Sequence, residues 1–406
     1  MFAWSYYSIM AERIIALVEK EMLIWARRTA SLDVAAASLA AHIPADKIAA
    51  WERGEDRPSI PEMKKLANAY KRPMSVFFLP EPPTEFQALR DFRRRDDVQG
   101  RYSRALAYEV RAAQERRLIA IDLAEALSDD VPRWDITTTI TDDPEVVAGR
   151  VREKLGISLD QQSRWGDPAK AFRAWRDSIE SHGVLVSVLG GAHHKIPIKE
   201  ARGFAIAERP FPMIVVNGQD RTNGRIFTLM HELGHVILGE SAIENDIEPS
   251  EMMPPPIRSI ETYCNRIAAG ILMPKMAVLA EQSVVGKNAR SEWTDVEIAA
   301  LARRYSVSRE ALLVRLAELG RIGPDFLQER RAAYAKQYEE IKEESGSGFA
   351  PYAIQIVSHL GRGFSRIVLQ GYHSQILTLS TASGYLGTQA KHVTNIERAT
   401  FDTQLN

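Results

Sequence analysis

The chain has 406 residues, a formal net charge of −1, 26% charged residues and a single cysteine. This length exceeds one ordinary domain, so we expect two or three domains, and the balanced charge gives no global attraction to nucleic acid or membranes. One cysteine excludes an intramolecular disulfide framework, and no apolar run approaches the roughly 20 residues of a membrane span, so we expect a cytoplasmic protein without a membrane partner.

Residues 1–21 are interpreted as an N-terminal extension. The stretch is apolar and aromatic, but Glu12, Arg13 and Glu19 interrupt it. It lacks the basic start and the small-residue cleavage site of a signal peptide. Two interpretations stay open, an extra helix or an upstream extension of a core that begins near Met22.

Residues 22–83 show the pattern of several short helices. Asp33 is a good N-cap for the second of them, and His42-Ile43-Pro44 breaks the chain before the third. Two short helices joined by a few turn residues are typical of a helix-turn-helix. The predicted helices cover 23–28, 34–40, 45–54, 62–70 and 71–80.

This stretch resembles the Cro-type (XRE) helix-turn-helix family. The matching residues are Trp51-Glu52-Arg53-Gly54-Glu55, Arg57-Pro58-Ser59, Leu66-Ala67 and Arg72-Pro73-Met74-Ser75-Val76-Phe77-Phe78-Leu79. The resemblance implies that the helix from Ala45 enters the major groove of DNA. The candidate DNA contacts are Ala45, Asp46, Lys47, Lys71 and Arg72. Ala45, Asp46 and Lys47 offer no bidentate base contact, and phosphates repel Asp46. A helical bundle that docks a protein partner is the alternative.

Residues 84–142 are predicted to form a helical connector, mainly a long helix over 101–128. A basic run at its start is a candidate for phosphate contacts. Charge runs are more often solvated faces, so this evidence has little weight. The run consists of Arg90, Arg93, Arg94, Arg95, Arg101 and Arg104.

Residues 143–322 mix helices with strands. Helices are predicted over 144–155 and 168–181, and strands over 183–189, 202–207 and 212–216. The strands predict a small antiparallel sheet, and its edge strand could align a peptide by adding it to the sheet.

The strongest motif of the chain is His231-Glu232-Leu233-Gly234-His235. Histidines four apart lie on one face of a helix, so both rings can bind one Zn²⁺, and Glu232 can act as general base on a water at that ion. The surrounding helix is apolar almost all round and should be buried, where unpaired His and Glu are unfavourable. The motif therefore predicts a hydrolase that cuts peptide bonds by metal-activated water. The alternative is a pair of solvated histidines.

A catalytic zinc usually has three protein ligands and one open position. Glu261 is the preferred third ligand, because it opens an amphipathic helix, and Asn265, four residues later, can orient a ligand histidine. Two alternatives stay open. Glu261 could serve only the dipole of a first helical turn, and Cys264 could be the ligand, although it falls on the apolar stripe. Tyr263 and His194 are weaker candidates for stabilising the transition state.

The last part of the chain is predicted to be helical. Residues 295–316 look like another helix-turn-helix, which we interpret as a helical pair covering the active site rather than a second DNA reader. Residues 323–406 form a C-terminal helical region with a charged helix over 326–344, a hinge at Ser345-Gly346-Ser347-Gly348, and a small tail over 352–401 that is a candidate for binding a partner protein.

Residues 168–319 resemble the ImmA/IrrE family of zinc metallopeptidases. The matching residues are Val216-Asn217, the run from Phe227 to His235, Glu261, and the run from Cys264 to Pro274. The sequence departs from the family at Cys264, Ile267 and Gly270, where Ala, Phe and Glu are usual. The resemblance implies zinc ligation by His231, His235 and Glu261, general-base catalysis by Glu232, and a fused XRE module.

The sequence therefore predicts an α+β chain that is mostly helical. It has an N-terminal helix-turn-helix bundle, a zincin-like metallopeptidase domain with a small antiparallel sheet, and a C-terminal helical tail. The function that the resemblance implies is a zinc endopeptidase and transcriptional regulator that cleaves an XRE-type repressor in stress or mobile-element control. The alternative is a DNA-binding regulator or antitoxin whose zinc domain is a sensor or scaffold. Expected partners are the protein substrate, operator DNA, and a toxin or other protein encoded by a neighbouring gene.

Overall fold

A computed structural model describes residues 14–30, 32–70, 72, 74–82, 90–91, 103–128, 132–190, 195–244, 253–344 and 351–401. The chain forms two compact units, the first made of residues 1–88 and 99–111 and the second of residues 89–98 and 112–406. Among the helices in these ranges, none is long and apolar enough to cross a membrane.

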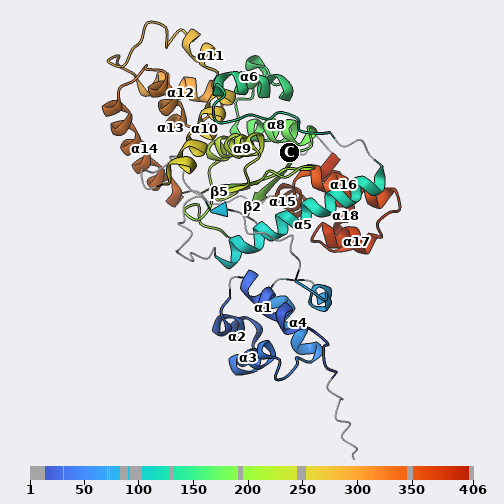
Figure 1. The fold of residues 1–406 in the computed structure, drawn as a ribbon. Helices are drawn as coiled ribbons and strands as arrows, with labels where there is room; N and C mark the ends of the chain where they lie inside the picture. The colour runs from blue at the N-terminus through green and yellow to red at the C-terminus, as the bar shows by residue number, and fades with distance from the viewer. Residues whose placement is uncertain are drawn as a thin grey trace, which may run out of the picture. The chain divides into compact units, whose positions relative to one another are not determined.

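The first unit is a bundle of short helices (Figure 1). Trp51, Tyr70 and Phe77 lie in its core. Asp33 caps α2 by accepting a hydrogen bond from the backbone N–H of Ala36, and His42 turns the chain with a φ of 52° before α3. The helices are α1 (Lys20–Thr29), α2 (Val34–Ala41), α3 (Ala45–Arg53), α4 (Ile60–Tyr70) and the 3₁₀ helix η1 (Met74–Phe78). The short helices predicted for this region are confirmed.

Side-chain pairs hold these helices together. Arg27 binds Glu52 through two hydrogen bonds of 2.6 and 2.8 Å, which joins α1 to α3. Glu62 pairs with Lys47, which joins α4 to α3. Glu62 also accepts hydrogen bonds from the backbone and hydroxyl of Ser59, as in a capping box at the start of α4. Burial alone would raise the pKa of the Glu62 carboxyl, but the hydrogen bonds from Lys47 and Ser59 lower it to about 2.

The predicted N-terminal extension is described only from residue 14 onward. Ile15 forms an antiparallel bridge with Ser59, and the Ala16 N–H donates to the Pro58 carbonyl. This part of the extension therefore pairs with the chain that enters α4.

In the described part of the second unit, five strands form one sheet of order β1-β5-β3-β4-β2. Its strands are β1 (Arg90–Asp91), β2 (Leu185–Leu189), β3 (Gly203–Ile206), β4 (Met213–Asn217) and β5 (Ala242–Glu244). The three predicted strands are present, but the prediction of an antiparallel sheet is wrong. β4 pairs antiparallel with β3 but parallel with β2, and β1 pairs parallel with β5. The sheet is mixed because β3 and β4 form a hairpin, and β2 lies on the outer side of β4.

Both faces of this sheet are covered, as the continuous burial of β2, β3 and β4 shows. Val186, Val188 and Ile214 face the main core, to which α8 and α9 contribute. On the other face, the Ser187 hydroxyl donates to the Leu360 carbonyl and accepts from Arg116, so α15 and α5 lie there. Figure 1 shows the sheet between these two groups of helices.

The remaining elements of the second unit are helical. They are α5 (Arg104–Leu127), in which the boundary of the units falls, α6 (Pro144–Leu155), α7 (Leu159–Arg164), α8 (Pro168–Ser181), α9 (Thr222–Leu238), α10 (Pro255–Leu272), α11 (Lys275–Ala280), α12 (Asp295–Arg304), α13 (Arg309–Glu318), α14 (Pro324–Glu344), α15 (Tyr352–Leu360), α16 (Arg362–His373), α17 (Leu379–Tyr385), η2 (Ala390–His392) and α18 (Val393–Phe401). The helices predicted over 101–128, 144–155, 168–181 and 326–344 are confirmed, as is the helical pair within 295–316.

The C-terminal helices belong to the second unit rather than forming a separate tail. Arg362 donates to Asp177 at 2.9 Å, and the Gly363 N–H donates to Glu180 at 2.9 Å. Both acceptors lie on α8, so the start of α16 is attached to the helix that covers the sheet. Burial raises the pKa of Glu180.

Three side chains, of which Gln162 and Arg315 are buried, cap the end of α10. Arg152 donates to the Ile271 carbonyl, Gln162 to Leu272, and Arg315 to Met273. The last carbonyls of a helix have no partner within the helix, so these three donors satisfy them. They come from α6, α7 and α13, which are thereby joined to the end of α10.

Candidate metal centre

Helix α9 supplies the two histidines and the glutamate of the motif. Residues 226–237 are all buried, and Gly239 ends the helix with a φ of 75°. His231 is 2% exposed, and Glu232 and His235 are fully buried. The prediction that this helix is buried is confirmed, which removes the alternative of solvated histidines.

Helix α10 lies directly against α9, and glycine permits the contact. A Cβ atom at Gly234 would lie 3.2 Å from the Cα and Sγ atoms of Cys264, closer than ordinary packing allows. The motif glycine therefore lets the two helix backbones approach each other. This contact brings Glu261, on α10, to the face of α9 that carries the histidines.

Three side chains converge at one point. The Nε2 atoms of His231 and His235 lie 3.1 Å apart. One carboxylate oxygen of Glu261 lies 3.2 Å from the His231 Nε2, and the other lies 3.6 Å from the His235 Nε2. Ligands about 2.0–2.1 Å from a tetrahedral zinc are separated by about 3.3 Å. The three residues therefore fit a single zinc-sized ion without rearrangement.

Asn265 holds the ring of His231. The two residues are joined by a 2.8 Å hydrogen bond between His231 Nδ1 and Asn265 Oδ1. If the ring donates through Nδ1, its Nε2 presents a lone pair toward His235 and Glu261, as a metal ligand must. The structure thus places Asn265 where the sequence analysis expects it.

The carboxyl of Glu261 lies against both imidazole rings. Burial alone would raise its pKa, but hydrogen bonds to His231 and His235 and attraction to their rings hold the pKa well below its usual range. A buried anion between two imidazoles supplies the negative charge that a divalent ion requires.

Cys264 is the competing ligand. Its Sγ and one ring nitrogen from each of His231 and His235 all lie within 4.8 Å of one another, and the thiol is buried. Glu261 contacts the imidazoles more closely, because its two oxygens lie 3.2 and 3.6 Å from the same Nε2 atoms that approach each other.

Glu232 packs against β3 through a glycine that the sequence analysis does not single out. A Cβ atom at Gly203 would lie 2.8 Å from Oε1 of Glu232 and 2.7 Å from Cγ2 of Thr228. Only a residue without a side chain lets β3 pass this close to the carboxylate. Nothing local in the sequence marks Gly203, because the approach involves α9, about 30 residues further along the chain.

Of the two weaker candidates, the structure describes Tyr263 alone. The Tyr263 hydroxyl forms a 2.9 Å hydrogen bond with Thr138 Oγ1. His194 lies outside the described residues.

Four of the five candidate DNA contacts lie in the described residues. Ala45 and Asp46 begin α3, and Lys47 pairs with Glu62. Arg72 is 9% exposed, stacks 3.9 Å over the Trp25 ring and donates to Thr29 at 2.9 Å, so its guanidinium is engaged within the unit. Lys71 lies outside the described residues.

Comparisons with known proteins agree with this site. Residues 180–317 match the family model described as the IrrE N-terminal-like domain, and the range includes α9 and α10. The chain is 30% identical over 158 residues to the radiation response metalloprotease IrrE of Deinococcus radiodurans, covering 39% of this chain and 46% of that protein. It is 34% identical over 158 residues to the protein of the same name from Deinococcus deserti, covering 39% and 53%.

These similarities concern one part of the chain. The chain spans about half the length of the curated relatives that it matches. No solved structure shows a significant match. Residues 180–317 therefore carry an IrrE-like domain.

Proposed function

We propose that this protein is a zinc-dependent endopeptidase. The observation that supports the proposal most strongly is the convergence of His231, His235 and Glu261 at distances that suit one zinc ion. The matches to two proteins named as metalloproteases support the same reaction class.

Each residue has a defined role in this proposal. His231, His235 and Glu261 hold the ion, and Asn265 orients His231. A bound zinc ion would supply Lewis-acid chemistry, polarising the scissile carbonyl and the attacking water. Glu232 accepts the proton of the attacking water and delivers it to the amide nitrogen of the leaving group. The contact between Gly203 and Glu232 keeps the carboxylate against β3.

The proposed substrate is a repressor of the XRE type. The first unit carries α2 and α3 joined by a three-residue turn, His42 to Pro44, which suits a helix-turn-helix. A protease fused to such a module acts on a related regulator, from a neighbouring gene or on another copy of this chain. The relatives named for a radiation response favour a role in stress control.

Glu232→Gln tests the reaction. The substitution preserves the shape of the side chain but removes the base, so the variant should retain wild-type zinc content and lose cleavage by about 100-fold or more. The measurement is mass spectrometry of a neighbour-encoded XRE repressor after incubation with each protein. Cleavage by the variant at the wild-type rate would contradict the mechanism.

A second function is favoured by the helices of the first unit. In this alternative the chain binds DNA as a regulator or antitoxin, and the metal domain is a sensor or scaffold. Electrophoretic mobility shifts with the promoter upstream of this gene test DNA binding, and the Glu232→Gln variant distinguishes the two proposals. If the metal domain is a scaffold, the Glu232→Gln variant should regulate this promoter as the wild type does. If the protein is an endopeptidase, the variant should no longer regulate it.

A further inference from the structure

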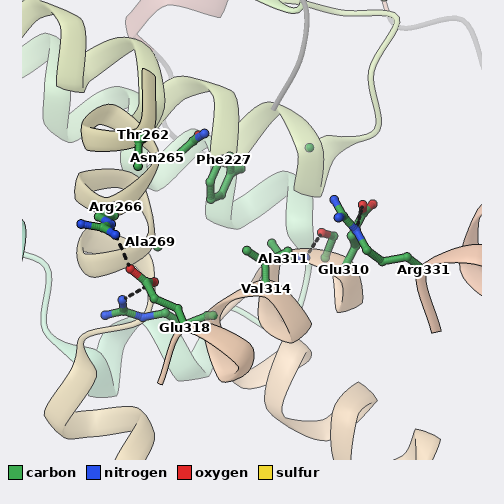
Figure 2. A pocket seen from close by; sticks show the side chains of 13 residues that line it. Phe227, Thr262, Asn265, Arg266, Ala269, Glu310, Ala311, Val314, Glu318 and Arg331 are labelled. Atoms are coloured by element: carbon green, nitrogen blue, oxygen red, sulfur yellow. Dashed lines mark hydrogen bonds and ion pairs between the residues drawn. The ribbon is translucent and has the colours of Figure 1, made fainter. Parts of the chain in front are cut away.

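A pocket of about 360 Å³ lies next to the metal centre, between the α9–α10 pair and α13 with α14. Figure 2 shows its side chains converging from these four helices. Phe227, Ala269, Ala311 and Val314 give it apolar walls. None of these residues has a role in the proposed reaction.

The three arginines around the pocket are all paired, with Glu310 and Glu318 of the pocket and with Glu145 outside it. Arg331 donates to Glu310 at 3.0 Å, and Glu318 accepts from Arg315 at 2.9 Å and lies 3.6 Å from Arg266. Figure 2 shows both groups of ion pairs at the edge of the pocket. Because the charges are compensated, the pocket selects for apolar contact rather than for the charge of its occupant.

The pocket and the metal centre share a side chain. Asn265 lines the pocket and also holds the His231 ring at 2.8 Å. Phe227 lies one helical turn before His231, and Thr262 follows Glu261 directly. Asn265 binds the Nδ1 side of the His231 ring, opposite to Nε2, so its amide is about 7 Å from the point where the ion would be held, with the imidazole between them. This distance is the length of about two residues of extended chain.

We propose that this pocket binds a large apolar side chain, such as Leu, Met or Phe, of a substrate residue within two positions of the scissile bond. The proposal rests on the endopeptidase function and specifies its substrate class. The occupant is a polypeptide side chain because the pocket is apolar, holds a volume of that size and lies within reach of a peptide whose scissile carbonyl is at the metal centre.

Filling the pocket tests the proposal. Val314→Trp places an indole in the space, and Val296→Trp on α12 is the matched control, because Val296 is 79% exposed and outside the pocket. The probe is a library of short peptides randomised at every position. Cleavage is read by mass spectrometry with otherwise wild-type protein, and binding is read by affinity selection on the Glu232→Gln variant.

The wild type should favour Leu, Met or Phe over Ala and Asp at one flanking position by about 100-fold in kcat/KM, within the range expected for an apolar pocket. Val314→Trp should lower this preference at least about tenfold, with unchanged zinc content, and Val296→Trp should keep it. An unchanged preference in Val314→Trp would overturn the pocket assignment while leaving the endopeptidase intact.

The binding arm separates the two proposals. If the wild type cuts neither a peptide nor the neighbour-encoded XRE repressor, the endopeptidase is refuted. Even then, the Glu232→Gln variant could select apolar peptides. If the double variant with Val314→Trp no longer selects them, the result supports a peptide-binding pocket. Absence of that selection would refute the pocket as well.

Discussion

At the scale of single residues, two donor groups of different chemistry, Glu261 and Cys264, lie close enough to the histidines to be the third ligand of the candidate metal centre. Glu261 faces both imidazoles. Burial alone would raise the pKa of its carboxyl, but the imidazoles lower it. Cys264 lies at the contact between α9 and α10 beside Gly234. The geometry favours the carboxylate, because its oxygens approach the two Nε2 atoms at ligand-to-ligand distances.

Glu261→Gln should abolish stoichiometric zinc binding, because it removes an anionic ligand, whereas Cys264→Ser should retain the metal. Zinc content by atomic absorption measures both. Glu240→Gln, just beyond the end of α9, is the control and should retain zinc. Loss of zinc in Cys264→Ser together with retention in Glu261→Gln would reverse the assignment.

Gly203→Ala should displace the Glu232 carboxylate, since the new Cβ atom would lie 2.8 Å from Oε1. We expect a large loss of kcat at unchanged zinc content and a destabilisation of about 1–3 kcal/mol. Gly149→Ala is the control, because nothing lies within 4 Å of that Cβ position on α6. There alanine should stabilise the helix by about 0.5–1 kcal/mol in urea unfolding. Equal effects of the two substitutions would argue against a specific role of Gly203.

At the scale of elements, α10 connects the metal centre to the helices around it. Its middle carries Glu261 and Asn265, and its end is held by donors from α6, α7 and α13. A Cβ atom at Gly270 would lie 2.8 Å from the Cβ of Ala148, so α10 also lies close to α6. The position of Glu261 thus depends on packing along the whole helix.

Gln162→Leu should destabilise the second unit, because Gln162 is 1% exposed and donates to the carbonyls of Leu272 and Tyr305. Each carbonyl left without a donor costs about 1–3 kcal/mol, measured as a lower urea midpoint. Gln370→Leu, the same change at an exposed glutamine on α16, is the control and should shift the midpoint little. Matching shifts in both variants would show that the carbonyl contacts of Gln162 contribute nothing.

At the scale of the whole molecule, the C-terminal helices are part of the unit that holds the metal centre. They cover the face of β2 opposite to α9, and the hydrogen bond from Ser187 to Leu360 belongs to this contact. The position of residues 351–401 therefore supports a structural role in addition to any partner that they bind.

Phe364→Ala should lower the stability of the metal-binding unit by about 3–5 kcal/mol, because this side chain of α16 is fully buried. Tyr352→Ala is the control, since Tyr352 is 49% exposed. Zinc release to a chromogenic chelator, followed during urea unfolding, should shift to lower urea in Phe364→Ala only. Zinc release at the wild-type midpoint in Phe364→Ala would show that the C-terminal helices fold independently of the centre.

The sequence by itself determines the elements and the chemistry of the site. Helical periodicity places His231 and His235 on one face of a buried helix, and the four-residue spacing of Glu261 and Asn265 places both on one side of another. These features follow from short-range backbone geometry, so the sequence analysis identifies the buried helix, the three predicted strands and the residues brought together at the centre.

Tertiary structure alone decides how these pieces meet. The parallel pairing of β2 with β4, the approach of Gly203 to Glu232, the engagement of Arg72 within its unit and the pocket beside Asn265 all join segments that are far apart in the chain. Local periodicity shows which face of an element is apolar but does not show which other element covers that face. The choice between Glu261 and Cys264 is of the same kind, because both lie on one helix and only the packing of α10 against α9 determines which faces the imidazoles.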